Sequence, residues 1–378
     1  MRNNASNFKS FYHGPRSFVR MRLGFFLLAT AVTLFPAYGQ GPAIAAENQS
    51  VLAIHHIDVG QGDATLIIAP NGKKLLIDGG NRGRGYKNIA KVLEDLSLDT
   101  IDYLLATHYD ADHIGGLDEV VKIIKSVPSK AFDYGESPKP KSQWTKQYKE
   151  YREAIGPNYG DRRVQLKAGV DNIDLGAEIS VRVVAANGEA LLSRLSTSSK
   201  PAPILKTFSL NVGEENAKSV ALKISYNCFD YFIGGDLTGG GKSGSRITKN
   251  LEAAVAPIVG DVDVLHVDHH GSQTSSDMEF LRTLSPEVAV ISVGNGHPNS
   301  RYHHPRRAVL DRLHTLNKEY NLKRIFMTNQ GETDGGLTAN DHKIMTIANG
   351  NIAIFSNGRS YVINGKTFKA DRKCFEDE

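Results

Sequence analysis

Apolar and polar residues alternate with a period of two just after residue 50, which indicates β-strands. The clearest runs are Val51 to Val59, Ala64 to Ala69 and Lys74 to Ile77, and turns containing Gly and Asn separate them. Short alternating runs divided by such turns are typical of a β-meander. We therefore expect the folded part of the chain to open with antiparallel strands.

Helical and strand patterns then alternate along the rest of the chain. The spacing of apolar residues predicts helices over 86–96, 116–126, 247–256 and 306–317. Strands are predicted over 101–107, 219–226, 231–234, 262–267, 288–293 and 324–328, with a closing hairpin over 349–363. Strands that alternate with helices in two rough halves fit a layered α/β architecture, in which loops at strand ends carry the chemistry.

Two stretches break this pattern, residues 128–170 and residues 192–218. The second is rich in Ser, Pro and Lys and is expected to be a loop. The first is expected to be an insertion or surface excursion, because it contains several prolines and nine Lys or Arg against five Asp or Glu between Lys130 and Lys167. Its interleaved aromatic residues are Tyr134, Trp144, Tyr148, Tyr151 and Tyr159. Basic groups with stacking aromatics suit single-stranded nucleic acid, and a solvated amphipathic lid is the alternative.

The first 45 residues have the features of a secretory signal peptide. Arg16, Arg20 and Arg22 precede an apolar run from Leu23 to Pro36, and Ala43-Ile44-Ala45 then offers a cleavage site. The apolar run is about 14 residues long, which is short for a membrane span of about 20. We expect this segment to be removed and the mature protein to be secreted or periplasmic, without stable membrane insertion. The alternative is an uncleaved membrane anchor that holds the protein outside the cytoplasm.

Composition sets only broad limits. Apolar residues make up 40% and charged residues 23% of the 378 residues, and the formal net charge is +4. These values are ordinary for a globular domain, and the mild positive charge permits an anionic substrate without demanding one. The two cysteines, Cys228 and Cys374, form no disulfide framework, although the sequence leaves a single bridge between them open. We expect one domain over 46–370 and a tail over 371–378.

The strongest chemical signal is the segment THYDADHIGG, from Thr107 to Gly116. Four potential metal ligands, His108, Asp110, Asp112 and His113, stand within six residues directly after an apolar strand. Imidazole and carboxylate ligands together suit zinc, manganese or iron. His108 and Asp110 lie on one side of an extended segment, and the other two turn toward a second position, so one loop can supply two metals. The alternative is a polar loop with a helix-capping aspartate.

This segment resembles the HxHxDH signature of the metallo-β-lactamase superfamily, in the variant with Asp at the third position. Further segments resemble, in the same order, motifs of the metallo-β-lactamase-fold domain in the ComEC DNA-uptake family. They are HIDVGQGDATLI (His56–Ile67), LLIDGG (Leu75–Gly80), FIGGDL (Phe232–Leu237), VDVLHVDHHGSQTSS (Val262–Ser276) and NSRYHHP (Asn299–Pro305). The resemblance spans residues 51–365 apart from the 128–170 stretch, and the ordered set is more specific than any one piece.

The resemblance implies a four-layer αββα metallo-β-lactamase sandwich. It also implies that Asp236 bridges two metal ions, and that Asp112 ligates one of them and orients the attacking hydroxide. Asp78 is expected to hold a ligand histidine from behind, with a turn-forming role before two glycines as the alternative. Asp63 and its neighbours in DVGQGD could line the same mouth, although a tight glycine turn explains much of that motif.

The chain departs from the family pattern in its histidines. None lies between the THYDADHIGG segment and residue 266, so the histidine that ligates the first metal in most relatives is missing. His269 or His270, at the end of a predicted strand, is expected to replace it, and His304 could close the second site. We expect two Zn²⁺ ions, while Asp110 in place of a histidine keeps Mn²⁺ or Fe open, because carboxylates suit oxygen-preferring metals.

These observations predict an exported metal-dependent hydrolase that uses a metal-activated hydroxide. A phosphodiesterase or nuclease is the first expectation, with DNA or a small phosphodiester as substrate, because paired metals clamp both the attacking and the leaving oxygen. A hydrolase of a lactam, lactone or ester and a non-catalytic, metal-stabilised binding module are the alternatives. The 128–170 stretch and the turn from Arg301 to Arg307 are expected to flank the metal mouth and attract an anion. The sequence does not define the oligomeric state.

Overall fold

The computed structural model describes residues 50–156, 160–169, 173–192, 206–209, 214–243, 246–295 and 302–370. The expected signal peptide, Tyr159, Arg301 and the tail with Cys374 lie outside these ranges. Within them, the chain forms two nine-stranded sheets and one two-stranded sheet.

The first large sheet begins with the predicted meander. Its strand order is β20-β19-β18-β1-β2-β3-β4-β5-β6. The strands are β1 (Leu52–His56), β2 (Thr65–Ile68), β3 (Lys74–Ile77), β4 (Tyr103–Leu105), β5 (Lys130–Asp133), β6 (Arg163–Gln165), β18 (Ile352–Ser356), β19 (Ser360–Ile363) and β20 (Lys366–Lys369). The strands β1 to β3 are antiparallel, whereas β3 to β6 pair in parallel. The predicted closing hairpin is confirmed as β18 and β19, with β18 paired to β1.

The second large sheet combines an antiparallel half with a parallel half. Its order is β17-β16-β15-β14-β11-β10-β7-β8-β9. The strands are β7 (Ile179–Ala186), β8 (Glu189–Leu192), β9 (Lys206–Ser209), β10 (Ala221–Tyr226), β11 (Phe229–Ile233), β14 (Val264–His266), β15 (Val288–Ile291), β16 (Arg324–Met327) and β17 (Met345–Ile347). From β11 to β17 all pairs are parallel. The two-stranded sheet joins β12 (Lys242–Ser243) to β13 (Arg246–Ile247).

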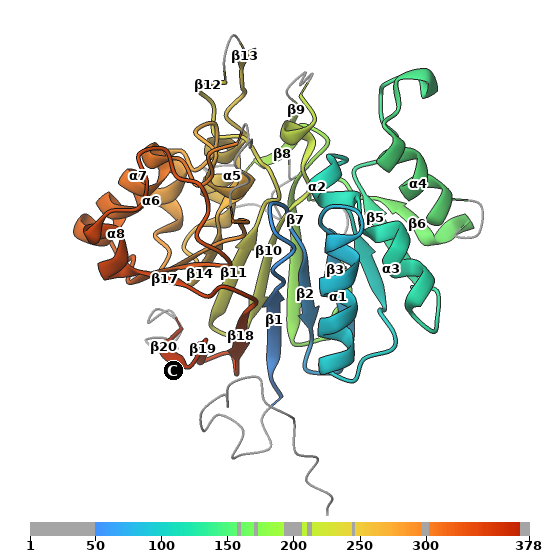
Figure 1. The fold of residues 1–378 in the computed structure, drawn as a ribbon, viewed down its shortest axis with the longest axis horizontal. Helices are drawn as coiled ribbons and strands as arrows, with labels where there is room; N and C mark the ends of the chain where they lie inside the picture. Colours follow the sequence, from blue (N-terminus) through green and yellow to red (C-terminus); the bar gives the residue numbers. More distant parts are fainter. Residues whose placement is uncertain are drawn as a thin grey trace, which may run out of the picture. The chain divides into compact units, whose positions relative to one another are not determined.

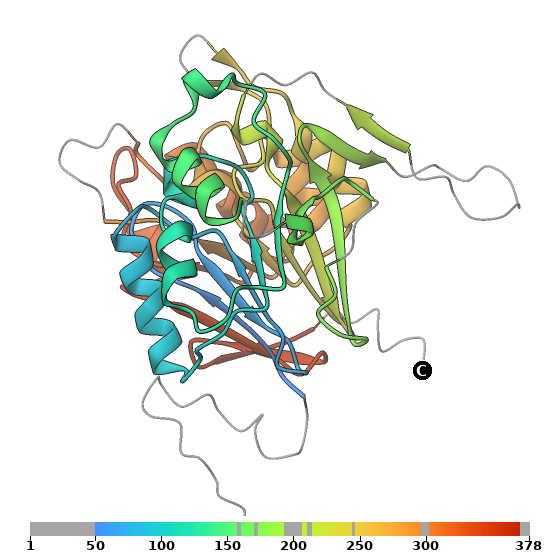
Figure 2. The ribbon, with the colours of Figure 1, turned by 90° about the vertical axis from the view of Figure 1, so that its right-hand side faces the viewer.

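Helices cover the outer faces of both large sheets (Figures 1 and 2). On the first sheet these are α1 (Arg84–Asp95), α2 (Ala111–Ile114), α3 (Leu117–Ile123) and α4 (Lys146–Ala154), with α1 beside α3 and α4 against α2 and α3. On the second sheet they are α5 (Leu251–Val259), α6 (Met278–Leu284), α7 (Arg307–Glu319) and α8 (Ala339–Ile344). None of the helices in the described ranges has the length and apolar character that a membrane crossing requires.

Two apolar cores hold these layers together. Tyr231 of β11 and Val264 of β14 belong to the core between the two sheets, whereas their chain neighbours Phe232 and Leu265 pack under the outer helices. Successive strand residues point to opposite faces, and strands covered on both faces therefore read as continuous apolar runs. The four-layer αββα sandwich is confirmed by this arrangement.

The 128–170 stretch is only partly an excursion. Its ends, β5 and β6, extend the first sheet, and α4 between them buries Tyr148 and Tyr151. Strands of three or four residues beside prolines are too short to reveal a period, which is why the sequence did not predict them. The predicted 192–218 loop likewise contains β9, which pairs with β8.

Candidate metal centre

The candidate site lies at the carboxyl ends of four strands, two from each large sheet. In the first sheet, Asp78 follows β3 and the His108–His113 segment follows β4. In the second sheet, Asp236 follows β11 and the His269-His270 pair follows β14. Both strand pairs are parallel neighbours, so these ends meet at the same edge of each sheet. The fold thus brings together residues as far apart in sequence as Asp78 and His270.

Asp236 stands at the centre of the cluster. Its Oδ1 lies 3.0 Å from Nε2 of His113 and 3.8 Å from Nε2 of His270. Its Oδ2 lies 3.7 Å from Nε2 of His108 and 3.5 Å from Nε2 of His269. Each carboxylate oxygen therefore faces a different pair of imidazoles, which is the arrangement that a bridging ligand needs.

The two aspartates of the metal loop divide between the same two pairs. Oδ2 of Asp110 lies 3.7 Å from Nε2 of His108, and Oδ2 of Asp112 lies 3.5 Å from Nε2 of His270. One potential ligand set is therefore His108, Asp110, His269 and Oδ2 of Asp236, and the other is Asp112, His113, His270 and Oδ1 of Asp236. The first of these sets is the one in which most relatives have a further histidine that this chain lacks, and His269 lies at that place here.

Among the residues that the structure describes, several of these atoms are buried and make no hydrogen bond of good geometry. They are Nε2 of His108, Nε2 of His113, Nε2 of His270 and Oδ1 of Asp236. A buried polar group normally finds a partner, because leaving it unpaired costs about 1–3 kcal/mol. Convergent imidazole nitrogens and a carboxylate oxygen are the donor set that Zn²⁺, Mn²⁺ and Fe²⁺ accept. The residues present therefore fit a divalent cation.

The charges of the cluster also favour a cation. Burial by itself lowers the pKa of His113, but the carboxylates of Asp236 and Asp78 raise it well above its usual value. The same balance raises the pKa of His270 to about 9, chiefly through Asp236. Burial acts to raise the pKa of Asp236, but the surrounding histidines hold it well below its usual range. Negative carboxylates thus retain protons on neighbouring imidazoles, which a metal would replace.

Asp78 makes three short contacts with the expected metal loop. Its carboxylate accepts the backbone N–H of Thr107 at 2.8 Å and the Thr107 hydroxyl at 2.7 Å, and it lies 2.8 Å from Nδ1 of His113. The side chain is buried, with 1% of its surface exposed. An imidazole that donates from Nδ1 keeps its Nε2 lone pair for a metal. The sequence had left a turn-forming role open, and both features occur here, because Asp78 also has φ 58°.

Asp63 is close enough to count as a ligand. Atoms of Asp63, His113, Asp236 and His270 lie within 4.8 Å of one another, and all four residues are buried. However, Asp63 faces Nδ1 of His270 at 3.7 Å, and this nitrogen lies 2.9 Å from the carbonyl oxygen of Ser292. The other carboxylate oxygen of Asp63, Oδ1, lies 3.1 Å from Nε2 of His266. We therefore place Asp63 behind His270, where it orients the ring, and the DVGQGD motif was the signal for it.

Asn216 is a site residue that the sequence did not reveal. It belongs to the 3₁₀ turn Asn216–Lys218, just before β10. Its Nδ2 donates to Oδ2 of Asp236 at 3.5 Å and lies 3.1 Å from Nε2 of His269. An asparagine amide beside the two groups that would share the first metal position can fix their orientation.

His304 lies beside the cluster. It does not belong to the group formed by Asp63, His113, Asp236 and His270. Its ring centroid is 5.6 Å from that of His269 and 6.2 Å from that of His270. The residue is 5% exposed, and its Nδ1 has no hydrogen-bond partner within the described ranges. Its role as a ligand of the second metal stays a prediction.

The described tyrosines of the 128–170 stretch are buried and pack against Tyr109 of the expected metal loop. Tyr109, between His108 and Asp110, packs its ring 4.2 Å from that of Tyr134 and 4.4 Å from that of Tyr148. All three tyrosines expose 5% or less of their surface. Buried rings cannot stack on bases, so the expected nucleic-acid platform does not form from them. Half-buried Trp144 packs edge-on against Tyr148 instead.

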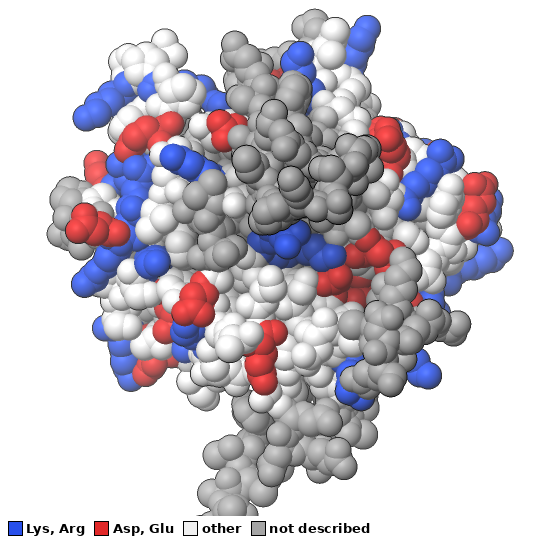
Figure 3. Space-filling model, turned by 180° about the vertical axis from the view of Figure 1, so that it is seen from behind, with Lys and Arg blue, Asp and Glu red and all other residues white. Residues whose placement is uncertain are grey.

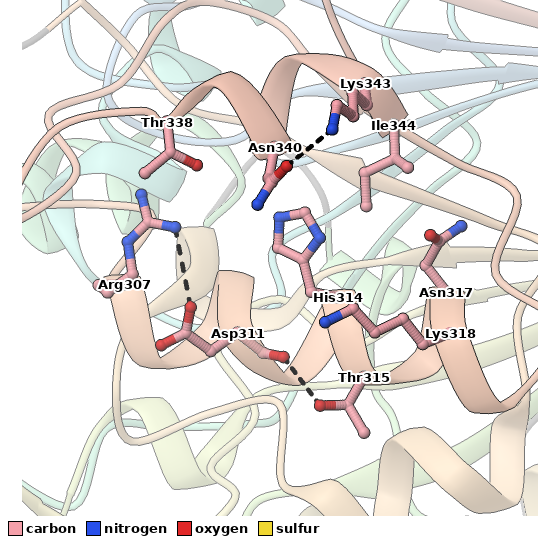
Figure 4. Close-up of a pocket in the computed structure, with 10 residues that line it drawn as sticks. All are labelled: Arg307, Asp311, His314, Thr315, Asn317, Lys318, Thr338, Asn340, Lys343 and Ile344. Carbon is pink, nitrogen blue, oxygen red and sulfur yellow. Dashed lines mark hydrogen bonds and ion pairs between the residues drawn. The ribbon is translucent and has the colours of Figure 1, made fainter.

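The expected basic rim is also smaller than the sequence suggests. Arg163 is paired with Asp133 and Glu136, and Arg307 is paired with Asp341. Arg307 lines a separate cavity of about 580 Å³ between α7 and α8, shown in Figure 4. The face in Figure 3 carries both signs of charge side by side among the described residues. Burial lowers the pKa of His304 to about 3, and the charges of His269 and His270 lower it further, with a smaller contribution from Arg306 of the expected turn.

Comparisons with known proteins agree with this fold. The family described as "Metallo-beta-lactamase superfamily" matches residues 57–183. "ComE operon protein 3" of Bacillus subtilis (strain 168) is 26% identical over 288 residues, which are 72% of this chain and 31% of that protein. "Recombination protein 2" of Haemophilus influenzae is 27% identical over 303 residues, which are 78% of this chain and 29% of that protein. The chain thus spans under a third of the length of these curated relatives.

Solved structures also align with this chain at low sequence identity. A diphosphatase from the PhnP family is 11% identical with a TM-score of 0.39, and the match covers 81% of this chain and 98% of that one. The family match and the ComEC-type homologues together show a metallo-β-lactamase domain with the fold of metallo-hydrolases.

Proposed function

We propose that this protein, a metallo-β-lactamase-fold hydrolase with ComEC-family homologues, is an exported two-metal phosphodiesterase that acts on DNA or a small phosphodiester. The observation that carries the proposal is the sharing of Asp236 between two ligand sets, each with its own aspartate and two histidines. Two adjacent cations suit an in-line displacement at phosphorus better than any single-metal arrangement. The name "Recombination protein 2" and that of another relative, the 27% identical "Competence protein ComA" of Neisseria gonorrhoeae, favour a nucleic-acid substrate.

The ligand residues divide into the two sets described above. His108, Asp110 and His269 would hold one ion, Asp112, His113 and His270 would hold the other, and Asp236 would bridge them. We expect Zn²⁺ in both positions, with Mn²⁺ or Fe as the alternatives because of Asp110. When bound, such ions lower the pKa of coordinated water toward about 7 and stabilise the charge that develops on oxygen.

The residues of the chain provide orientation and charge around the ions. Asp78 would orient the ring of His113 through its Nδ1 atom, and the Ser292 carbonyl would orient that of His270, with the charge of Asp63 nearby. Arg306, two residues after His304, would add a positive charge near the cluster and favour an anionic substrate. These groups would bind and orient a phosphate, whereas a neutral lactam or lactone would gain little from Arg306.

The first test combines metal content with a substrate comparison. Elemental analysis of the purified protein should find one or two ions per chain, and the loaded enzyme should hydrolyse single-stranded DNA or bis(p-nitrophenyl) phosphate faster than a lactam or a lactone. Asp112→Ala should abolish turnover and lower the metal content to about one ion, while His314→Ala in the α7–α8 cavity should change neither. Fast lactam or lactone hydrolysis without phosphodiesterase activity would overturn the substrate assignment.

Two further experiments test the alternative of a non-catalytic binding module and the expected export. Metal uptake with salt-sensitive DNA binding but no cleavage would favour the binding module, since salt weakens each phosphate contact. Export is tested by mass spectrometry of the secreted or periplasmic protein, which should begin near Ala46. An intact N-terminus in a cytoplasmic fraction contradicts the export part.

A further inference from the structure

A buried histidine that is not a candidate ligand lies behind the metal centre. His266 is the last residue of β14, just before the turn that carries His270, and it is fully buried. Its Nε2 atom lies 3.0 Å from the hydroxyl oxygen of Ser292 and 3.1 Å from Oδ1 of Asp63. Because an ionised carboxylate can only accept hydrogen bonds, the proton of this imidazole is expected on Nε2. One N–H group of His266 thus faces two oxygen atoms.

Both of these partners also reach the ring of His270. The carbonyl oxygen of Ser292 lies 2.9 Å from Nδ1 of His270, and Oδ2 of Asp63 lies 3.7 Å from the same nitrogen. Asp63 therefore turns one carboxylate oxygen toward each histidine, and Ser292 turns its hydroxyl toward one and its carbonyl toward the other. Nε2 of His270, on the other side of its ring, is left to face the carboxylates of the metal cluster.

The place of His266 in the fold favours an apolar residue. Its strand, β14, pairs in parallel with β11 on one side and β15 on the other, and such strands are usually apolar throughout because helices and sheets cover both faces. A buried imidazole costs free energy unless it is hydrogen-bonded. Among the described residues, Nδ1 of His266 is buried and makes no hydrogen bond of good geometry. The polar contacts of this side chain therefore go to the two residues behind His270, which indicates a role at the metal centre.

We propose that His266 is a positioning residue of the metal centre, which acts on His270 through Asp63 and Ser292. This inference rests on the metal-binding part of the proposed function and holds for any substrate. While both partners are held in place, Nδ1 of His270 keeps its hydrogen bond and its Nε2 lone pair is directed at the metal position. The effect is confined to the ion of the second ligand set described above, since the first set contains His269 instead.

The test measures Zn²⁺ binding to the purified protein after metal removal, by competition with a chromophoric chelator that resolves two dissociation constants. His266→Asn places its amide near the position of Nδ1 and loses both contacts, whereas His266→Gln can reach the position of Nε2. His266→Asn should therefore weaken the binding of one ion about 10- to 100-fold and leave the other unchanged, and His266→Gln should restore the affinity.

His56→Asn is the matched control. His56 of β1 is also fully buried, and its ring lies 4.9 Å from that of His266. Its nitrogens lie 3.4 Å from the hydroxyl of Thr65 and 3.3 Å from that of Tyr231. This variant should keep both dissociation constants, even if the protein unfolds at a lower temperature.

A second comparison shows whether the effect passes through His270. In a protein that already carries His270→Ala, His266→Asn should cause no further loss of affinity for the remaining ion, because residues that act through one ligand are not additive. If His266→Asn does not fold, Ser292→Ala replaces it, since this change removes the hydroxyl partner and keeps the carbonyl; weaker binding of one ion then supports the inference, and unchanged binding of both refutes it.

The other outcomes separate this inference from the proposed function. Equal weakening of both ions by His266→Asn would overturn the positioning role, because the residue would then only stabilise the fold. Wild-type affinity for both ions in His266→Asn would overturn it as well and leave the two-metal function intact. Failure of the wild-type protein to bind zinc would overturn the metal-binding function and, with it, this inference.

Discussion

Replacing Asp78 by asparagine removes one charge from the carboxylate that supports the metal loop and keeps its size. The carboxylate has three contacts of 2.7 to 2.8 Å, two with Thr107 and one with Nδ1 of His113. An asparagine can keep its carbonyl oxygen on the backbone N–H of Thr107. Its NH₂ group then points at the Thr107 hydroxyl and at Nδ1 of His113. The hydroxyl can accept a hydrogen bond instead of donating one, but an N–H at Nδ1 has no acceptor in an NH₂ group.

The expected loss follows from the tautomer of His113. To accept a hydrogen bond from the new NH₂ group, Nδ1 must give up its proton, which moves to Nε2. A protonated Nε2 has no lone pair for a metal, although this atom is the one that lies 3.0 Å from Asp236. Loss of such a supporting contact typically weakens metal binding or activity about 10- to 100-fold. The charge-assisted hydrogen bond is also lost, which costs about 1.5–3 kcal/mol of folding free energy in the metal-free protein.

Asp102→Asn provides the matched control. Asp102 stands before β4, at the opposite end from Thr107, and accepts the backbone N–H of Lys74 at 2.8 Å. Zinc affinity is measured by competition with a chromophoric chelator, and stability by thermal unfolding of the metal-free protein. Asp78→Asn should lose affinity at least tenfold relative to Asp102→Asn. Equal affinities of the two variants would refute the tautomer argument, even if Asp78→Asn unfolds at a lower temperature.

Two further predictions concern buried carboxylates away from the ligand atoms. Burial raises the pKa of Asp268, while Glu252 accepts two backbone N–H groups before α6, so Asp268 holds the proton of this pair. Urea unfolding at pH 7 should therefore find Asp268→Asn within about 1 kcal/mol of wild type and Glu252→Gln about 1–3 kcal/mol less stable; the reverse order contradicts the assignment. Burial by itself raises the pKa of Asp341, but hydrogen bonds from Arg307 and Thr338 lower this pKa below its usual range. The charged Asp341 side chain therefore stabilises the fold above the unfolded pKa of about 3.9, and this stabilisation is lost as the pH falls from there through the folded pKa. Thermal melts should show Asp341→Asn less stable than wild type at pH 7 by a difference that shrinks toward pH 3, and a constant difference would show that charge is not the cause.

The metal loop could be predicted from the sequence because its ligands are neighbours in the chain. His108, Asp110, Asp112 and His113 need only a strand that ends and a turn that follows it. Their convergence with Asp236 depends on contacts between two sheets, and only the resemblance to a family supplied it. Neither local spacing nor the resemblance to a family could have predicted Asn216. A single asparagine before a strand has no sequence pattern that distinguishes it from a turn residue.

The burial of the tyrosines in the 128–170 stretch was not predictable for a related reason. The basic residues around them suggest an exposed surface, yet Arg163 contacts Asp133 and Glu136, and Arg152 contacts Glu136. These ion pairs are made between residues that are distant in sequence, so charge counting could not reveal that the cations are already neutralised. Local composition therefore described the chemistry of the stretch but not the face that it presents.

The backbone of the site shows why local propensity could not have identified its shape. Within the described ranges, ten non-glycine residues have positive φ, and seven of them are Asn or Ser. The other three are Asp78, His269 and His270, at φ 58°, 51° and 54°. The left-handed conformation costs a residue with a Cβ atom roughly 1–2 kcal/mol, and glycine would avoid this cost. Glycine has no side chain to bind or support a metal, so the fold holds three strained residues at positions where imidazole or carboxylate is needed. Such strain persists only where the surrounding structure over-determines it, here through the hydrogen bonds of Asp78 to Thr107 and of His270 to the Ser292 carbonyl. Three of the ten positive-φ positions thus lie in the candidate metal centre, where the need for an imidazole or a carboxylate explains why glycine is absent.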